Sequence, residues 1–153
     1  MTSTEAGLEY DHRCFACGAH NERGLRLSFR FEGDEYLCEF EPEPWVQGWV
    51  GMTHGGIICT LLDEVMNRLV FERGGWAVTA ELNVRFRRPV PTGTRVVVRS
   101  RLRGRRKRLY EAEAEVVLPD GEIAASATGK FLEVPGAAEQ AAGGAAGGDR
   151  DAV

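Results

Sequence analysis

The chain has 153 residues, enough for one domain with its own hydrophobic core. Its hydrophobic content of 43% and charged content of 27% are typical of a globular protein, and its net charge of −4 argues against general affinity for nucleic acid. No apolar run approaches transmembrane length, and the acidic N-terminus does not resemble a secretory signal. We therefore expect a cytoplasmic protein that binds neither nucleic acid nor membrane.

Residues 1–11 are polar, and we expect a loose N-terminus there. Cys14 and Cys17 follow, flanked by His12 and His20, which is a possible zinc site. A second cysteine pair at zinc-ribbon spacing is absent from the sequence, and the histidine spacing is not that of a zinc finger. The alternative is a tight turn with small buried thiols. We predict that Cys14 and Cys17 bind no metal.

Alternating apolar and polar residues predict six β-strands. The runs are 25–31, 36–40, 80–86, 96–102, 110–116 and 122–134. Turn-forming residues such as Gly33 and the segment 119–121 separate them. Alternation in every strand indicates an antiparallel sheet with one covered face. Residues 135–153 are rich in Ala and Gly, and we expect a disordered tail there.

Residues His54–Val70 predict an amphipathic helix, because their apolar side chains recur at three- and four-residue spacing. Asp63 lies at the seam between the apolar face and a narrow polar stripe, where partial burial raises the pKa of a carboxylate. Gly55 and Gly56 open the helix and leave its first N–H groups unshielded, so this end can stabilise a developing negative charge. The alternative is a core helix with a flexible glycine entry and one stray acid.

The glycine-punctuated loop 45–53 precedes this helix and contains Trp49 and Met52. Two interpretations stay open: a plug beneath the loop in the core, or the wall of an apolar pocket. One long helix packed on one antiparallel sheet predicts a single α+β domain over residues 12–134.

Three motifs lie within residues 14–134. They are Cys14-Phe15-x-Cys17-Gly18-(x)2-Asn21-(x)2-Gly24-Leu25; Gln47-Gly48-(x)2-Gly51-(x)2-His54-Gly55-Gly56 followed by Leu61-Leu62-Asp63-Glu64; and Thr79-(x)3-Asn83-(x)2-Phe86-x-Arg88-Pro89. Together they resemble the PaaI-type acyl-CoA thioesterases of the hotdog-fold superfamily. The resemblance implies a hotdog fold, in which an antiparallel sheet wraps around one long central helix.

The resemblance also implies hydrolysis of acyl-CoA thioesters without metal or cofactor. It assigns Asp63 as general base or nucleophile, the Gly55 N–H as oxyanion donor, and Thr79 as the residue that positions water or the carboxylate. Simple alternation points Thr79 to the face opposite Leu82, so a twist or bulge is needed to bring it into the site. His54 either holds the turn or touches substrate, and we favour the structural role.

Many members of the family carry an Asn or Gln six residues before the His, whereas this chain has Gly48 there and Gln47 one residue earlier. We expect the substrate to be bound by residues of the loop, the helix entry and a basic turn: Gln47, Gly48, Trp49, Met52, Gly56, Arg105 and Arg106.

The segment between Leu82 and Tyr110 is rich in arginine and contains no acidic residue. A hairpin centred near Arg106 forms cross-strand pairs, namely Arg101 with Glu111 and Arg99 with Glu113. Arg105 and Arg106 are left without such partners, and we expect them to contact the phosphates of CoA. The alternative is a solvated loop.

Gly55 and Asp63 are eight residues apart on one helix, or about 12 Å along its axis. One reacting carbonyl cannot be within reach of both. We therefore predict a homodimer with a shared site, in which an antiparallel partner helix sets its Asp63 beside this chain's Gly55. The strand 78–87 is the expected contact, because pairing closes an exposed sheet edge. A tetramer built as a dimer of dimers is a further possibility.

Three other functions are compatible with parts of the sequence. A non-catalytic acyl-CoA-binding or regulatory hotdog protein would keep the pocket without needing Asp63. A zinc- or nucleic-acid-binding module would use Cys14 and Cys17 and the arginines, but it would need aromatic residues interleaved with the basic run, where only Tyr110 is near. A hotdog hydratase carries a different signature.

Overall fold

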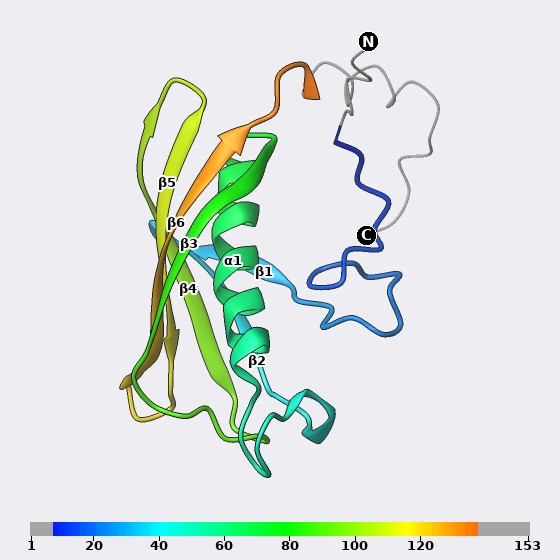
Figure 1. Cartoon of the computed structure of the whole chain (residues 1–153), viewed down its shortest axis with the longest axis vertical. Coiled ribbons are helices and arrows are strands. Elements are labelled where there is room, and N and C mark those ends of the chain that lie inside the picture. The colour runs from blue at the N-terminus through cyan, green and yellow to red at the C-terminus, as the bar shows by residue number, and fades with distance from the viewer. Residues whose placement is uncertain (1–7, 138–153) are drawn as a thin grey trace.

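The computed structural model describes residues 8–137 (Figure 1). The elements in chain order are β1 (Phe29–Glu32), β2 (Glu35–Phe40), the 3₁₀-helix η1 (Pro44–Val46), α1 (Gly55–Glu72), β3 (Ala77–Phe86), β4 (Val96–Arg106), β5 (Leu109–Val117) and β6 (Ile123–Glu133). Most of the expected loose N-terminus and disordered tail lies outside the described residues. Within those residues, no helix combines the length and the apolar character that a membrane crossing requires.

The six strands form one antiparallel sheet with the order β1-β2-β4-β5-β6-β3. The helix α1 lies across one face of this curved sheet (Figure 1). It buries the apolar side chains Ile58, Leu61, Leu62, Val65, Met66, Leu69 and Val70. Full burial of each such side chain stabilises the fold by roughly 1.5–3 kcal/mol. The predicted α+β class and hotdog arrangement are confirmed.

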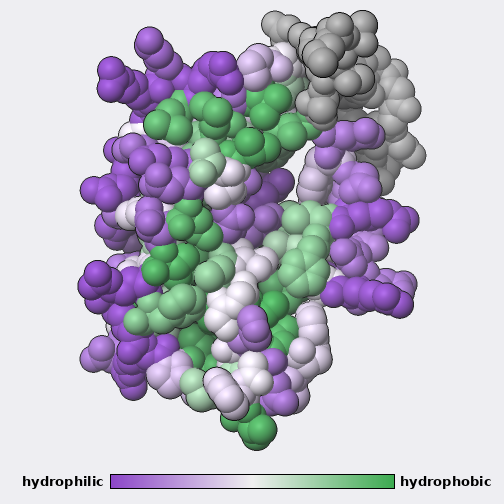
Figure 2. All heavy atoms as spheres, viewed as in Figure 1, coloured by the Kyte–Doolittle hydropathy of each residue, from purple (hydrophilic) through white to green (hydrophobic). Residues whose placement is uncertain are grey.

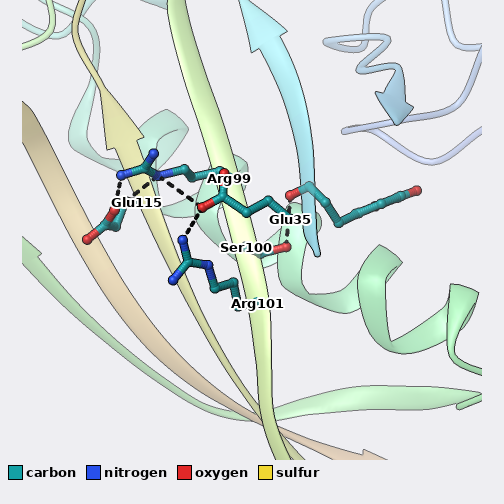
Figure 3. A network of polar contacts seen from close by, with 6 residues as sticks. Glu35, Arg99, Ser100, Arg101 and Glu115 are labelled. Atoms are coloured by element: carbon teal, nitrogen blue, oxygen red, sulfur yellow. Dashed lines mark hydrogen bonds and ion pairs between the residues drawn. The ribbon is translucent and has the colours of Figure 1, made fainter. Parts of the chain in front are cut away.

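A buried hydroxyl joins the helix to the sheet. Ser100 of β4 is almost fully buried, and its Oγ lies 3.0 Å from the Val65 carbonyl oxygen of α1 and 3.2 Å from that of Tyr36 in β2. On the outer face of the same strand, Arg99 and Arg101 form ion pairs with Glu35 and Glu115 (Figure 3). The helix side of the sheet therefore carries the core, and the outer side carries charge.

The first predicted strand is shorter than expected. β1 begins at Phe29, because the backbone N–H groups of Leu25 and Leu27 donate to loop carbonyls instead, each at 2.9 Å. Arg26 between them has a φ of 52°, in the left-handed region that a strand excludes. The alternation of residues 25–28 therefore packs against the N-terminal loop and not against β2.

The predicted register of the basic hairpin is wrong by two residues. The chain turns at Lys107 and Arg108, and Lys107 takes a φ of 55°. A bulge between Leu102 and Gly104 then moves the pairing back by one residue toward the predicted register. The observed cross-strand partners are Arg101 with Glu113 and Arg99 with Glu115.

β3 lies at one edge of the sheet and leaves apolar side chains open to solvent. Phe86 is 54% exposed and Val78 is 43% exposed, whereas Leu82 and Val84 are partly buried against the core. Figure 2 shows hydrophobic residues along the middle of the face where β3 and α1 lie, with hydrophilic residues along both edges of that view. The described chain thus presents an unpaired, apolar sheet edge, which proteins usually cover.

Candidate active site

The N-terminus of α1 is capped by His54. Its Nδ1 accepts a hydrogen bond from the Gly56 N–H at 2.8 Å. A Cβ at position 56 would lie 3.0 Å from that nitrogen, so the cap favours glycine there. The Gly55 N–H is in the first turn, has no intrahelical acceptor, and finds no other acceptor among residues 8–137. The structural role that we favoured for His54 fits this cap, which leaves one free donor at Gly55.

A cleft of about 650 Å³ opens beside this free N–H. Its lining residues are Gly48, Trp49, Met52, Thr53, His54, Gly55, Ile58, Phe86, Arg87, Arg88, Pro89 and Val90. Trp49 is 81% exposed, so it forms part of the wall and does not plug the core. The buried apolar residue of this loop is Val46, in η1. The structure therefore favours the pocket-wall interpretation for Trp49 and Met52.

Gln47 has a different position from the one we expected. Its side-chain oxygen accepts a hydrogen bond from the Gly51 N–H at 3.2 Å, so it holds the loop closed. Neither Gln47 nor Gly56 lines the cleft, whereas Gly48 does. A Cβ at position 48 would approach His54 to 3.3 Å, which is consistent with a close contact between the loop and the helix cap.

Asp63 and Thr79 form the second group of predicted site residues. Thr79 Oγ1 donates to Asp63 Oδ1 at 2.8 Å. The β3–β6 register shifts between Thr79 and Glu81, so the predicted bulge is present and turns Thr79 toward the helix. Burial raises the pKa of the half-buried Asp63 carboxyl, and the hydrogen bond from Thr79 opposes that shift. The carboxylate is thus oriented and made more basic.

The two groups stay apart within one chain. Gly55 lines the cleft, whereas Asp63 and Thr79 do not. Eight residues of α-helix separate Gly55 from Asp63, which corresponds to about 12 Å. A single chain therefore presents an oxyanion donor beside an apolar cleft at one place and a positioned carboxylate at another.

The basic turn lies at the end of the sheet opposite the loop that precedes α1 (Figure 1). Arg105 pairs with Glu133 at 3.0 Å, and its guanidinium lies over the Tyr110 ring at 4.7 Å. The prediction that Arg105 lacks a partner is wrong, because β6 brings Glu133 beside the hairpin. Arg106 forms no ion pair with any residue in the described range.

Two cations that we did not assign to the site line the cleft. Arg88 pairs with Asp120 at 3.1 Å, and Arg87 donates to Ser126 Oγ at 3.2 Å. Both follow β3 directly, where two backbone N–H groups donate to the Ala124 carbonyl. The signal available in the sequence was the Arg-Arg-Pro at the end of a predicted strand.

Comparisons with known proteins agree with this architecture. The model of the thioesterase superfamily matches residues 50–125. Acyl-coenzyme A thioesterase THEM4 of Bos taurus is 39% identical over 66 residues, which cover 43% of this chain and 27% of that protein. The matched part thus spans well under half of that relative.

Two solved structures share the fold. A thioesterase superfamily protein superposes with a TM-score of 0.73 at 23% identity, covering 78% of this chain and 62% of that one. The PaaI protein from the phenylacetic acid degradation operon of E. coli gives a TM-score of 0.66 at 18% identity, covering 71% and 84%. The sequence match and the shared architecture show that the chain belongs to the thioesterase superfamily and has the PaaI-type hotdog fold.

Proposed function

We propose that this chain hydrolyses acyl-CoA thioesters to a free acid and CoA. The observation that carries the proposal is the hydrogen bond from Thr79 of β3 to Asp63 of α1, the helix whose first N–H is free beside an apolar cleft. The relative THEM4 is named an acyl-coenzyme A thioesterase, which supports the same chemistry. A non-catalytic acyl-CoA-binding protein would have no need of a carboxylate that is both partly desolvated and oriented by a hydroxyl.

The chemistry follows from these groups. Asp63 takes a proton from water while the water oxygen attacks the thioester carbonyl carbon. The tetrahedral oxyanion accepts a hydrogen bond from the Gly55 N–H. Its collapse breaks the C–S bond, and the thiolate of CoA takes up a proton. In the alternative route, Asp63 attacks the carbonyl directly, and water then hydrolyses the resulting anhydride.

We infer that two chains share each site. A two-fold axis beside β3 would pair its exposed edge with the same edge of a partner and would cover Val78 and Phe86. The partner helix then runs antiparallel, so that the partner's Asp63 approaches this chain's Gly55. Two equivalent sites result, each with one cleft and one carboxylate. Further pairing of two dimers into a tetramer is compatible with this arrangement.

The cleft supplies an apolar surface for the acyl group, with Trp49, Met52 and Phe86 in its wall. The CoA phosphates need cations. Arg87 and Arg88 stand at the cleft itself. With antiparallel β3 strands, the partner's basic turn comes to the same end of the dimer as this cleft. Arg105 and Arg106 of that turn are therefore further candidates to contact the CoA phosphates.

The direct test is an acyl-CoA panel of varied chain length, with aryl and alkyl members, assayed for release of free thiol. We expect turnover for at least one class and no dependence on an added cofactor. Calorimetric binding of an acyl-CoA by a folded dimer, without thiol release from any member of the panel, would instead support the non-catalytic binding protein.

A further inference from the structure

The loop of residues 12–20 is a tightly closed turn. The Gly18 N–H donates to the Cys14 carbonyl oxygen at 2.9 Å, and the His20 N–H donates to that of His12 at 3.0 Å. A Cβ on Gly18 would lie 2.5 Å from the Cys14 backbone nitrogen, so this close approach requires glycine. The backbone therefore fixes the position of Cys14 relative to Cys17 before any ligand binds.

The central helix adds a third donor to these two thiols. Cys14 Sγ lies 3.7 Å from Glu64 Oε1, and one ligand atom each from Cys14, Cys17 and Glu64 lie within 4.8 Å of one another. All three side chains are half-buried. Ligands of one tetrahedral zinc ion, each at about 2.0–2.3 Å, are separated from one another by about 3.5–4 Å. The three side chains thus need only small movements to meet one ion.

The Glu64 carboxylate has no cationic partner among residues 8–137. The nearest arginine along the helix, Arg68, pairs with Glu72 at 3.8 Å and lies over the rings of Tyr10 and Phe71. A cation bound beside the two thiols would therefore pair with this carboxylate without breaking an existing ion pair.

We propose that Cys14, Cys17 and Glu64 bind one zinc ion that ties the N-terminal loop to the middle of α1. On binding, the two thiols lose their protons to solvent and become thiolates. Water fills the fourth position of the tetrahedron. We expected no metal from the sequence because it lacks a second cysteine pair, and the fold now supplies a third ligand from a distant segment.

The proposed zinc site stands apart from the thioesterase chemistry. Glu64 follows Asp63 directly in α1, but the two side chains have different neighbours. Asp63 accepts a hydrogen bond from Thr79 of β3, whereas Glu64 contacts Cys14 of the N-terminal loop. The proposal therefore does not rest on the proposed function.

The first test uses the full chain, purified without a histidine tag and without chelators, and measures its zinc content. We expect about one zinc per chain. After removal of zinc, added Co²⁺ should give the intense near-ultraviolet charge-transfer band of cobalt bound to thiolate. Protein with only trace zinc that gives no such band with Co²⁺ would overturn the proposal.

Matched variants locate the site. Loss of an outer-shell partner costs about 10–100-fold in metal affinity, so loss of a direct ligand in Cys17→Ser or Glu64→Gln should cost at least as much. Cys59→Ser and Glu72→Gln change a thiol and a carboxylate on the same helix outside the cluster and should leave affinity unchanged. Equal affinity in all four variants would identify adventitious binding and overturn the proposal.

Alkylation of the unaltered protein provides a test that does not depend on variant folding. Zinc should protect Cys14 and Cys17 from iodoacetamide, as read by mass spectrometry, while leaving the reactivity of Cys59 unchanged. Identical labelling of Cys14 and Cys17 with and without zinc would count against the site.

Discussion

The N-terminus and the middle of α1 each supply one part of the proposed catalytic site and lack the other. The N-terminus of α1 has a free N–H at Gly55 and an apolar cleft, but no carboxylate from residues 8–137 lines that cleft. The middle of the helix has Asp63, oriented by Thr79, but every N–H there is engaged in the helix ladder. Gly55 and Asp63 are about 12 Å apart along the axis of one rigid helix, so they cannot act on the same carbonyl group. The difference indicates that the reactive unit is larger than one chain.

Removal of the carboxylate should have the largest effect. Asp63→Asn keeps the size of the side chain and its capacity to accept from Thr79, but it removes the base. We expect kcat to fall by about 10²–10⁴ with little change in acyl-CoA binding. Steady-state kinetics with calorimetry would measure both. Substantial retained hydrolysis would exclude Asp63 as base and as nucleophile.

The same variant carries a check on its folding. Burial raises the folded-state pKa of Asp63 above its usual range, so the folded chain holds this proton more tightly than the unfolded chain. The stabilisation is present at low pH and is lost as pH rises through the folded-state pKa. Asp63→Asn should therefore be at least as stable as the parent at neutral pH, which urea unfolding would measure.

The oxyanion donor offers the next largest effect. Gly55→Pro removes only the N–H, since proline suits the first position of a helix. His54 before it already has the extended backbone, with φ −59° and ψ 135°, that proline requires of its neighbour. We expect a loss of about 10²–10³ in kcat.

Gly55→Ala is the matched control, because it keeps the N–H and places its Cβ at an ordinary 3.7 Å from the Phe86 ring. Similar rates for the Pro and Ala variants would show that this N–H does not serve the oxyanion.

Mixing the two lesions tests the shared site itself. A heterodimer of Asp63→Asn with Gly55→Pro has one site with both lesions and one site with neither. Activity should return to about half that of the parent dimer, because one of its two sites is intact. The measurement is turnover of purified, doubly tagged heterodimers. If these heterodimers are folded and dimeric yet remain inactive, the model in which two chains share each site is wrong.

Thr79 should act on the pH profile more than on the maximal rate. Its hydrogen bond lowers the pKa of Asp63 against the effect of burial. Thr79→Ala removes that bond, so the pKa of Asp63 rises and the acidic limb of the kcat/KM profile moves to higher pH. Thr79→Ser keeps the hydroxyl and should keep the limb in place. An unshifted limb in Thr79→Ala would separate Thr79 from Asp63 in function.

The smallest effect concerns the phosphates. Arg106→Glu should raise KM for acyl-CoA more than for a short acyl thioester without the nucleotide, because only the former carries phosphates. Arg30→Glu makes the same charge change on β1, at the opposite edge of the sheet from β3. An equal rise in KM for both thioesters would contradict a phosphate contact at Arg106. Arg87 and Arg88 in the cleft would then remain as the candidate phosphate ligands.

The sequence by itself determined the elements and their periodic faces. Side-chain periodicity is a local property, so it located α1 to within two residues at its C-terminal end and showed Asp63 at the margin of the apolar face. It also indicated that Thr79 needed a bulge, because strict alternation pointed that side chain the wrong way. The motifs that carried the family resemblance were likewise contiguous in the chain.

Tertiary structure decided what depends on pairing between distant segments. The hairpin register followed from a two-residue turn and a bulge, neither of which alternation reveals. Arg105 met Glu133 because β6 lies beside β5, and Leu25 and Leu27 left the sheet because the N-terminal loop bound their N–H groups. Glu64 met Cys14 only because the loop folds back onto α1, fifty residues further along the chain. Such contacts are set by competition among many possible partners for each hydrogen-bonding group and apolar surface, and a one-dimensional pattern does not contain the outcome of that competition.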